Sequence, residues 1–294
     1  MVTRTGENNI VQLTLPRVLV NCFYVLLLTF YPVLSMADVA PADFRQQQSD
    51  EVWENNIRKA NFQDRKIIEG VDQNILEVKA PYTAEDATVV PISILTKIPQ
   101  TDGQYIKKIH IFVDKNPVPL VGIFEFTPHS GKADLAMRIR VDDFSYVRAI
   151  AELNTGELYM AKSFVRAKGA CSAPPPASME ESKKLLGKMK INTIGTLELG
   201  KPNLTQLKIR HPNITGLAPL KIGSHVRPPA HFVNQIEVDY NGQLIMKAQL
   251  TFSVSMDPAF RFYFVPDKEG VMTVKGSDTK NNHFSSTHEV TLST

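Results

Sequence analysis

Hydrophobic and polar residues alternate along most of the chain, and this pattern predicts the elements of the fold. Alternation with a period of two is typical of antiparallel strands that have one buried face. In the first half of the chain it predicts strands at 88–96, 105–114, 119–127, 133–142, 145–153 and 157–167. In the second half it predicts strands at 191–199, 204–212, 232–240, 243–251, 259–266, 270–278 and 283–292.

Turn signals separate these segments. Residues 114–117 (DKNP) and 154–156 (NTG) fit turns, and Asn241-Gly242 between two strands is a strong hairpin signal. Short strands at regular spacing, with no helices between them, indicate a β-sandwich. Because there are two such series, we predict an all-β fold with two immunoglobulin-like β-sandwich domains.

A short helix precedes the first sandwich. Residues 49–65 are rich in helix-forming residues, and Ser49 with Trp53 suggests a capped start. Residues 38–44 are expected to be a flexible leader.

A break in the pattern separates the two series. Three consecutive prolines at 174–176 cannot form a strand ladder, and residues 179–190 are charged and weakly helical. We therefore predict a first sandwich over 38–171, a Pro-rich linker over 172–190 and a second sandwich over 191–294.

The N-terminal segment predicts export. An apolar run covers 18–35, and Ser35-Met36-Ala37 places small residues at both positions that a signal peptidase reads. The alternative is a membrane anchor, but Asn21 and Pro32 interrupt the run. We expect residues 1–37 to be a cleaved signal peptide, which leaves a periplasmic protein without a membrane span.

Composition limits the partners. The 294 residues are 43% hydrophobic and 21% charged, with a formal net charge of +3. That content is enough for two domains of ordinary size. Because the charge is mild and no long Lys/Arg block occurs, a nucleic-acid partner is not expected.

One cysteine stands out. Of the two in the chain, Cys22 lies in the expected signal peptide, so the mature protein keeps a single thiol at Cys171. Arg166 and Lys168 precede it and are expected to lower its pKa. Gly169 lets the backbone bend, and small neighbours leave the sulfur open. These features predict a reactive thiol on an arm, and the alternative is a spare cysteine in a linker.

Other chemistry is hard to find. The seven histidines (110, 129, 211, 225, 231, 283 and 288) show no metal-ligand spacing, so no metal site is expected. Asp142-Asp143 and Glu180-Glu181 are expected to be solvated loop charges. No motif for a catalytic triad or a phosphate-binding loop occurs. We therefore expect no cofactor and no catalytic residue, and the thiol suits a carrier better than an enzyme.

The chain resembles a known protein family. Its first domain resembles SoxY through IFVDKNPVPLVGIFEF (111–126), MRIRVDDFSYVRAIAEL (137–153) and GELYMAKSFVRAKGAC (156–171), and its second resembles SoxZ through LKIRHPNITG (207–216) and the PPAHFVNQIEVDYNGQLIMKAQL hairpin (228–250). The resemblance implies a fused carrier with two immunoglobulin-like sandwiches that pair. It also implies that Cys171 attaches a sulfur-containing cargo covalently, and the residues beside it, Arg166, Lys168 and Gly169, are expected to support that role.

The sequence around Cys171 departs from the family in two ways. The glycines that follow the cysteine in the family are missing here, and the arm continues into a second domain. The fused form is similar to SoxYZ-like carriers associated with quinoprotein alcohol dehydrogenases. Expected partners are periplasmic oxidoreductases, either Sox-type enzymes or a quinoprotein dehydrogenase with its cytochrome c.

Three functions follow as hypotheses. The leading one is a periplasmic thiol carrier that loads cargo at Cys171. The second is a non-catalytic accessory module of a dehydrogenase system, in which Cys171 is incidental. The third is an enzyme, a single-cysteine thiol transferase or persulfide handler, which would turn over repeatedly where a carrier stops after one equivalent.

Overall fold

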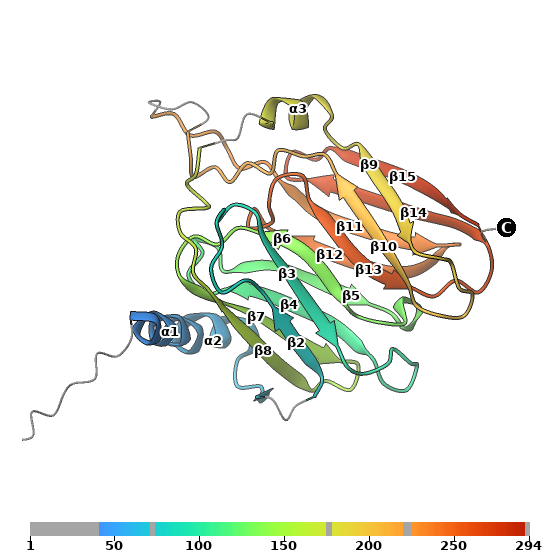
Figure 1. The fold of residues 1–294 in the computed structure, drawn as a ribbon, viewed down its shortest axis with the longest axis horizontal. Helices are drawn as coiled ribbons and strands as arrows, with labels where there is room; N and C mark the ends of the chain where they lie inside the picture. The colour runs from blue at the N-terminus through green and yellow to red at the C-terminus, as the bar shows by residue number, and fades with distance from the viewer. Residues whose placement is uncertain (1–40, 71–73, 175–177, 220–224, 292–294) are drawn as a thin grey trace, which may run out of the picture. The chain divides into compact units, whose positions relative to one another are not determined.

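Strands from both halves of the chain build two β-sheets (Figure 1). The computed structural model describes residues 41–70, 74–174, 178–219 and 225–291, so the predicted signal peptide lies outside the described residues. One sheet has nine strands in the order β1-β8-β7-β4-β5-β12-β11-β14-β15, and the other has six in the order β2-β3-β6-β13-β10-β9. No helix among the described residues combines the length and the apolar character that crossing a membrane requires.

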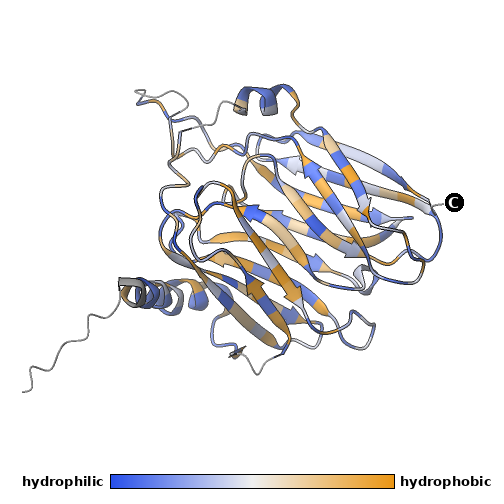
Figure 2. Cartoon of the chain, viewed as in Figure 1, coloured by the Kyte–Doolittle hydropathy of each residue, from blue (hydrophilic) through white to orange (hydrophobic). Residues whose placement is uncertain are grey.

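The strands follow the alternating pattern closely. The first half contains β1 (Ile67–Glu69), β2 (Leu76–Lys79), β3 (Val90–Thr96), β4 (Ile106–Val113), β5 (Leu120–Phe126), β6 (Leu135–Ile139), β7 (Ser145–Leu153) and β8 (Leu158–Val165). The second half contains β9 (Met189–Ile194), β10 (Asn203–Ile209), β11 (Val233–Tyr240), β12 (Gln243–Leu250), β13 (Ala259–Phe264), β14 (Gly270–Asp278) and β15 (His283–Val290). Figure 2 shows hydrophobic and hydrophilic positions interleaved along them. The all-β class and the immunoglobulin-like sandwiches are thus confirmed.

A few boundaries differ from the pattern. The sequence analysis did not predict β1 and β2, which are only three and four residues long, although Leu76 and Val78 of β2 alternate with polar residues. The strand predicted over 191–199 ends at Ile194, because Gly195 adopts a φ of 87° and turns the chain. The Asn241-Gly242 hairpin is confirmed, with both residues at positive φ between β11 and β12.

The two halves share both sheets. β5 pairs with β12 from Gly122↔Leu250 to Phe126↔Met246, and β6 pairs with β13. A Cβ at Gly122 would lie 2.8 Å from the Gln249 carbonyl oxygen, so this close pairing requires glycine. The core is continuous across the junction, where the Phe124 and Phe260 ring centroids are 6.0 Å apart. The two sandwiches therefore bury a common core.

The N-terminal helical segment covers the outer side of β4, β7 and β8. It consists of α1 (Pro41–Val52), a π-helical turn (Trp53–Ile57) and α2 (Arg58–Phe62). The helix begins earlier than predicted, at Pro41, where proline suits the first turn. Ser49 is no cap: it lies inside α1, and its hydroxyl donates to Asp114 Oδ2 at 2.7 Å. Trp53 packs against Phe112 in a buried satellite cluster.

Between the halves lies the segment that carries Cys171. It leaves β8, passes Gly169 at a φ of 80° and reaches the short helix α3 (Met179–Lys184) before β9. The positive φ confirms the bend that the sequence predicted at this glycine. The domain boundaries at 171 and 191 remain predictions.

Candidate functional site

The segment around Cys171 is docked between the two halves of the chain. From the first half, Asp142 accepts a hydrogen bond from the Cys171 N–H at 2.8 Å through Oδ1, and its carbonyl accepts one from the Gly169 N–H at 2.7 Å. From the second half, Thr215 Oγ1 donates to the Cys171 carbonyl at 2.8 Å. The cysteine is only 1% exposed. The expectation of an open thiol is therefore wrong for this docked arrangement.

The electrostatic surroundings of the thiol also differ from the expectation. Burial of the thiol and, after it, the nearby Asp142 carboxylate raise the pKa of Cys171 from 9.0 to about 12, although Arg140 partly opposes them. Arg166 instead lies over the rings of Phe144 and Tyr82, 5.3 and 5.8 Å from their centroids. The predicted lowering of the pKa by sequence neighbours is wrong in this state, because those side chains point elsewhere.

The other predicted basic neighbour does not face the sulfur either. Lys168 is exposed, and it is not among the charges that act on the Cys171 thiol. Docked as it is here, the thiol is protonated at neutral pH and is a poor nucleophile.

Arg140 is the cation that the sequence analysis did not single out. It is 8% exposed, and its guanidinium donates to the Asn213 carbonyl at 3.0 Å and to the Ala170 carbonyl at 3.5 Å. Burial lowers its pKa, while Cys171 and Asp86 act in the opposite direction. Arg140 directly follows the last residue of β6, Ile139, and its two hydrogen bonds join the arm to the loop that follows β10. Alternation predicted a strand here but not a contact with a distant loop.

A pocket adjoins this docked segment. It has a volume of about 520 Å³, and Arg138, Arg140, Pro174, Thr215 and Met256 are among its lining residues. The residues come from both halves and from the arm itself, so the pocket depends on the docked position of the arm.

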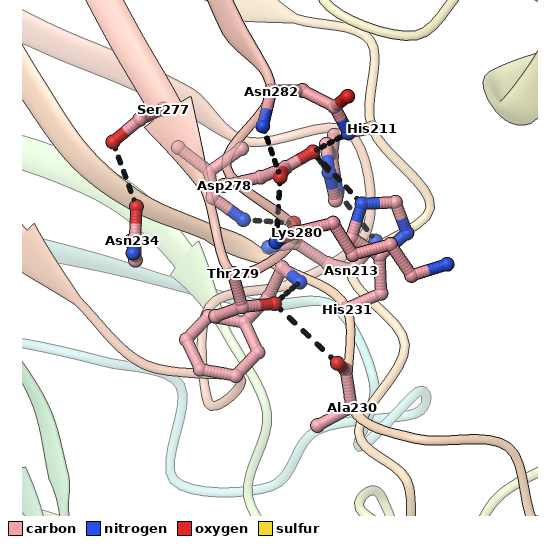
Figure 3. A network of polar contacts seen from close by, with 12 residues as sticks. His211, Asn213, Ala230, His231, Asn234, Ser277, Asp278, Thr279, Lys280 and Asn282 are labelled. Atoms are coloured by element: carbon pink, nitrogen blue, oxygen red, sulfur yellow. Dashed lines mark hydrogen bonds and ion pairs between the residues drawn. The ribbon is translucent and has the colours of Figure 1, made fainter.

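A buried cluster of two histidines and one carboxylate supports the second-half side of the site (Figure 3). His211 Nε2 lies 3.3 Å and His231 Nε2 lies 2.8 Å from Asp278 Oδ2. The Asn213 N–H donates to His211 Nδ1 at 3.0 Å, which assigns the ring proton of His211 to Nε2. Burial lowers the pKa of His211 to about 4, so this ring is neutral at pH 7.

This cluster is also the group of described residues with the spacing of metal ligands, because one ligand atom from each lies within 4.8 Å of the others. Both oxygens of the Asp278 carboxylate, however, already accept hydrogen bonds from protein groups. Asp278 Oδ1 accepts from the Lys280 and Asn282 N–H groups, and Oδ2 accepts from the Asn282 amide as well as both rings. Although burial raises the pKa of Asp278, these hydrogen bonds hold it below its ordinary value. The arrangement fits a satisfied structural cluster, and the dispersed positions gave no sequence signal for it.

Asn213 joins this cluster to the arm. Its side-chain amide donates to the Val254 and Ser255 carbonyls, and its Oδ1 accepts from the Val233 N–H. It adopts a φ of 38°, which asparagine tolerates better than most residues. The His211 ring therefore fixes a loop whose carbonyl holds Arg140, and Thr215 in the same loop holds Cys171.

Two family models match the chain in tandem. Residues 58–171 match the sulfur oxidation protein SoxY, and residues 193–289 match the sulphur oxidation protein SoxZ. No curated protein matches the chain.

Three solved structures illustrate a distant likeness to this chain. A superoxide reductase (neelaredoxin) from Ignicoccus hospitalis is 15% identical with a TM-score of 0.31, covering 34% of this chain and 94% of that one. A putative superoxide reductase from Thermotoga maritima is 18% identical with a TM-score of 0.30, covering 35% and 92%. A beta-glycosidase from Bacteroides vulgatus is 10% identical with a TM-score of 0.21, covering 73% and 25%. Similarities this low say nothing about function.

Proposed function

Because the chain belongs to the SoxYZ type of sulfur carrier, with a SoxY and a SoxZ domain fused in tandem, we propose that it carries a sulfur-containing intermediate covalently on Cys171. The domains support a carrier role in sulfur oxidation, and a carrier needs no catalytic residues. One observation carries the choice of residue: the SoxY match ends at Cys171, the free cysteine of the described chain, on a segment between the two domains.

The docked arm serves as the resting state of the carrier. Burial and the Asp142 carboxylate keep the thiol protonated, so it resists oxidation and unwanted exchange. Few polar contacts hold the segment, chiefly those to Asp142 and Thr215. Releasing them would let the arm swing at Gly169, which adopts a φ of 80° and as a glycine has wide backbone freedom.

Once released, the thiol returns toward its ordinary pKa, and its thiolate can load cargo. The step is thiol–disulfide exchange: the Cys171 thiolate attacks a sulfur of R–S–S–R′, forms Cys171–S–S–R and expels R′–S⁻. The S–S bond that breaks is replaced by one that forms, so no external oxidant is required. Arg166 and Lys168 would then lie near the freed sulfur and favour an anionic cargo.

The location and partners belong to the same proposal. An exported protein would meet periplasmic oxidoreductases, either Sox-type enzymes or a quinoprotein dehydrogenase with its cytochrome c. The burial of the thiol favours one rival, the accessory module in which Cys171 has no role.

The test is the intact mass of the protein purified from its native compartment, before and after a reductant. We expect a mass excess that maps to the Cys171 peptide and disappears on reduction, and its size would identify the cargo. The Cys171→Ser variant should fold normally and carry no adduct. An adduct that persists in the Cys171→Ser variant would refute the carrier proposal. A bare thiol in the native protein, together with a partner enzyme that co-purifies equally well with the variant, would support the accessory module instead.

A further inference from the structure

A basic groove crosses the outer face of the six-stranded sheet. It has a volume of about 860 Å³ and runs over β6, β13, β10 and β9, which lie side by side in that order (Figure 1). Its floor contains the small residues Ser93, Ala136 and Ala259, and Leu185 after α3 adds an apolar contact. The groove is thus a shallow surface formed by strands of both domains.

The charge of this groove is one-sided. Six cationic side chains line it, against the single carboxylate of Asp257; they are Arg138, Lys188, Lys190, Lys208, Arg210 and Arg261. Arg210 pairs with Asp257 at 2.7 Å, which leaves no carboxylate lining the groove for the other cations. Within the described part of the chain, Lys188, Lys190, Lys208 and Arg261 have no carboxylate oxygen within 4.0 Å. The mild net charge of the whole protein conceals this local excess.

One pair in the groove works against the stability of the fold. Lys190 on β9 and Lys208 on β10 are direct cross-strand partners, and both are exposed. Like charges placed opposite each other on neighbouring strands destabilise a sheet. An anionic group bound between these two strands would relieve the repulsion between Lys190 and Lys208.

The groove continues to the carrier arm. Arg138 and Asp257 line both the groove and the pocket beside the arm, whose lining also includes Pro174 and Met179. A partner seated in the groove would therefore meet the segment that must release Cys171.

We propose that this groove is the docking surface for a partner protein with an acidic surface, namely the enzyme that exchanges cargo with Cys171. The assignment of cargo exchange to this partner rests on the proposed function. Cations spread over four strands, which at about 4.8 Å per strand span roughly 15 Å, suit an extended acidic surface. A small anion would instead need a few donors that converge on one point.

The first experiment measures binding of a fluorescently labelled polyglutamate peptide by anisotropy at low ionic strength. We expect saturable binding that weakens as salt is added. The Lys208→Glu/Arg261→Glu variant should bind at least about tenfold more weakly. The matched control is Lys66→Glu/Lys107→Glu, which makes the same change in charge at exposed lysines outside the groove and should bind like the wild type. Equal losses in both variants would overturn the proposal.

Two further arms separate this inference from others. The Cys171→Ser variant should bind the peptide as tightly as the wild type does. If the groove binds the peptide but Cys171 of the native protein carries no cargo, the carrier function is refuted and the docking surface is retained. Vesicles of phosphatidylglycerol test the other source of negative charge. Binding of vesicles through Lys208 and Arg261, with no binding of the peptide, would assign the groove to a membrane surface and overturn the protein partner.

Discussion

The docking of the cysteine arm can be tested by removing one hydrogen bond that holds it. Thr215→Val deletes the hydroxyl that donates to the Cys171 carbonyl at 2.8 Å, while keeping nearly the same side-chain shape. A neutral hydrogen bond contributes about 1 kcal/mol net, which corresponds to about a fivefold change in the equilibrium between docked and released arm. The same hydroxyl accepts from the Leu217 N–H, so the loop itself also loosens.

The starting point for this change is a slow reaction. At pH 8, a thiol with a pKa of 9.0 is roughly 10% thiolate, whereas one with a pKa of about 12 is roughly 0.01% thiolate. Docked Cys171 should therefore react about a thousandfold more slowly than a free cysteine, even before its burial blocks the reagent. Reaction then proceeds through the released arm, and its rate follows the released fraction.

The assay is the rate of reaction with an aromatic disulfide reagent at pH 8, followed by absorbance. We expect wild type to react far more slowly than a cysteine peptide, Thr215→Val to react about fivefold faster than wild type, and Thr215→Ser to match wild type because it keeps the hydroxyl. All three should react alike in denaturant. Wild-type labelling at the rate of the free peptide would refute the docked arm, and equal rates for Val and Ser would refute the role of Thr215.

Two further predictions concern stability. Burial lowers the pKa of His211 in the folded state from 6.5 to about 4. Between pH 4 and 6.5 the unfolded state therefore binds more protons than the folded state does. The free energy of unfolding should fall as the pH drops from 6.5 to 4, by at most about 3 kcal/mol. Urea unfolding at several pH values measures this, and a flat profile would contradict it. Lys190→Glu should stabilise the fold by about 0.2–1 kcal/mol, because it turns a like-charge pair with Lys208 into an opposite-charge pair. Thermal unfolding against Lys107→Glu as control checks it, and a lower melting temperature for Lys190→Glu would count against the pairing.

The sequence by itself determined the local structure and the chemical identity of the candidate thiol. Alternation with a period of two located the main strands, since side chains on a strand point to opposite faces wherever the strand lies in the molecule. The Asn241-Gly242 turn and the bend at Gly169 could also be predicted, because glycine and asparagine tolerate positive φ better than other residues do. The count of cysteines singled out Cys171, and the motifs around it identified the family.

Only the tertiary structure decided the environment of that thiol. The sequence neighbours Arg166 and Lys168 suggested a lowered pKa, but Asp142 and Arg140, from the loop between β6 and β7, lie near the buried sulfur instead. The pairing of β5 with β12 and of β6 with β13 was likewise invisible, because alternation shows which face of a strand is buried and not which strand lies beside it. Burial of the sulfur is the largest cause of its raised pKa, and both burial and through-space electrostatic effects depend on how distant parts of the chain pack around the cysteine.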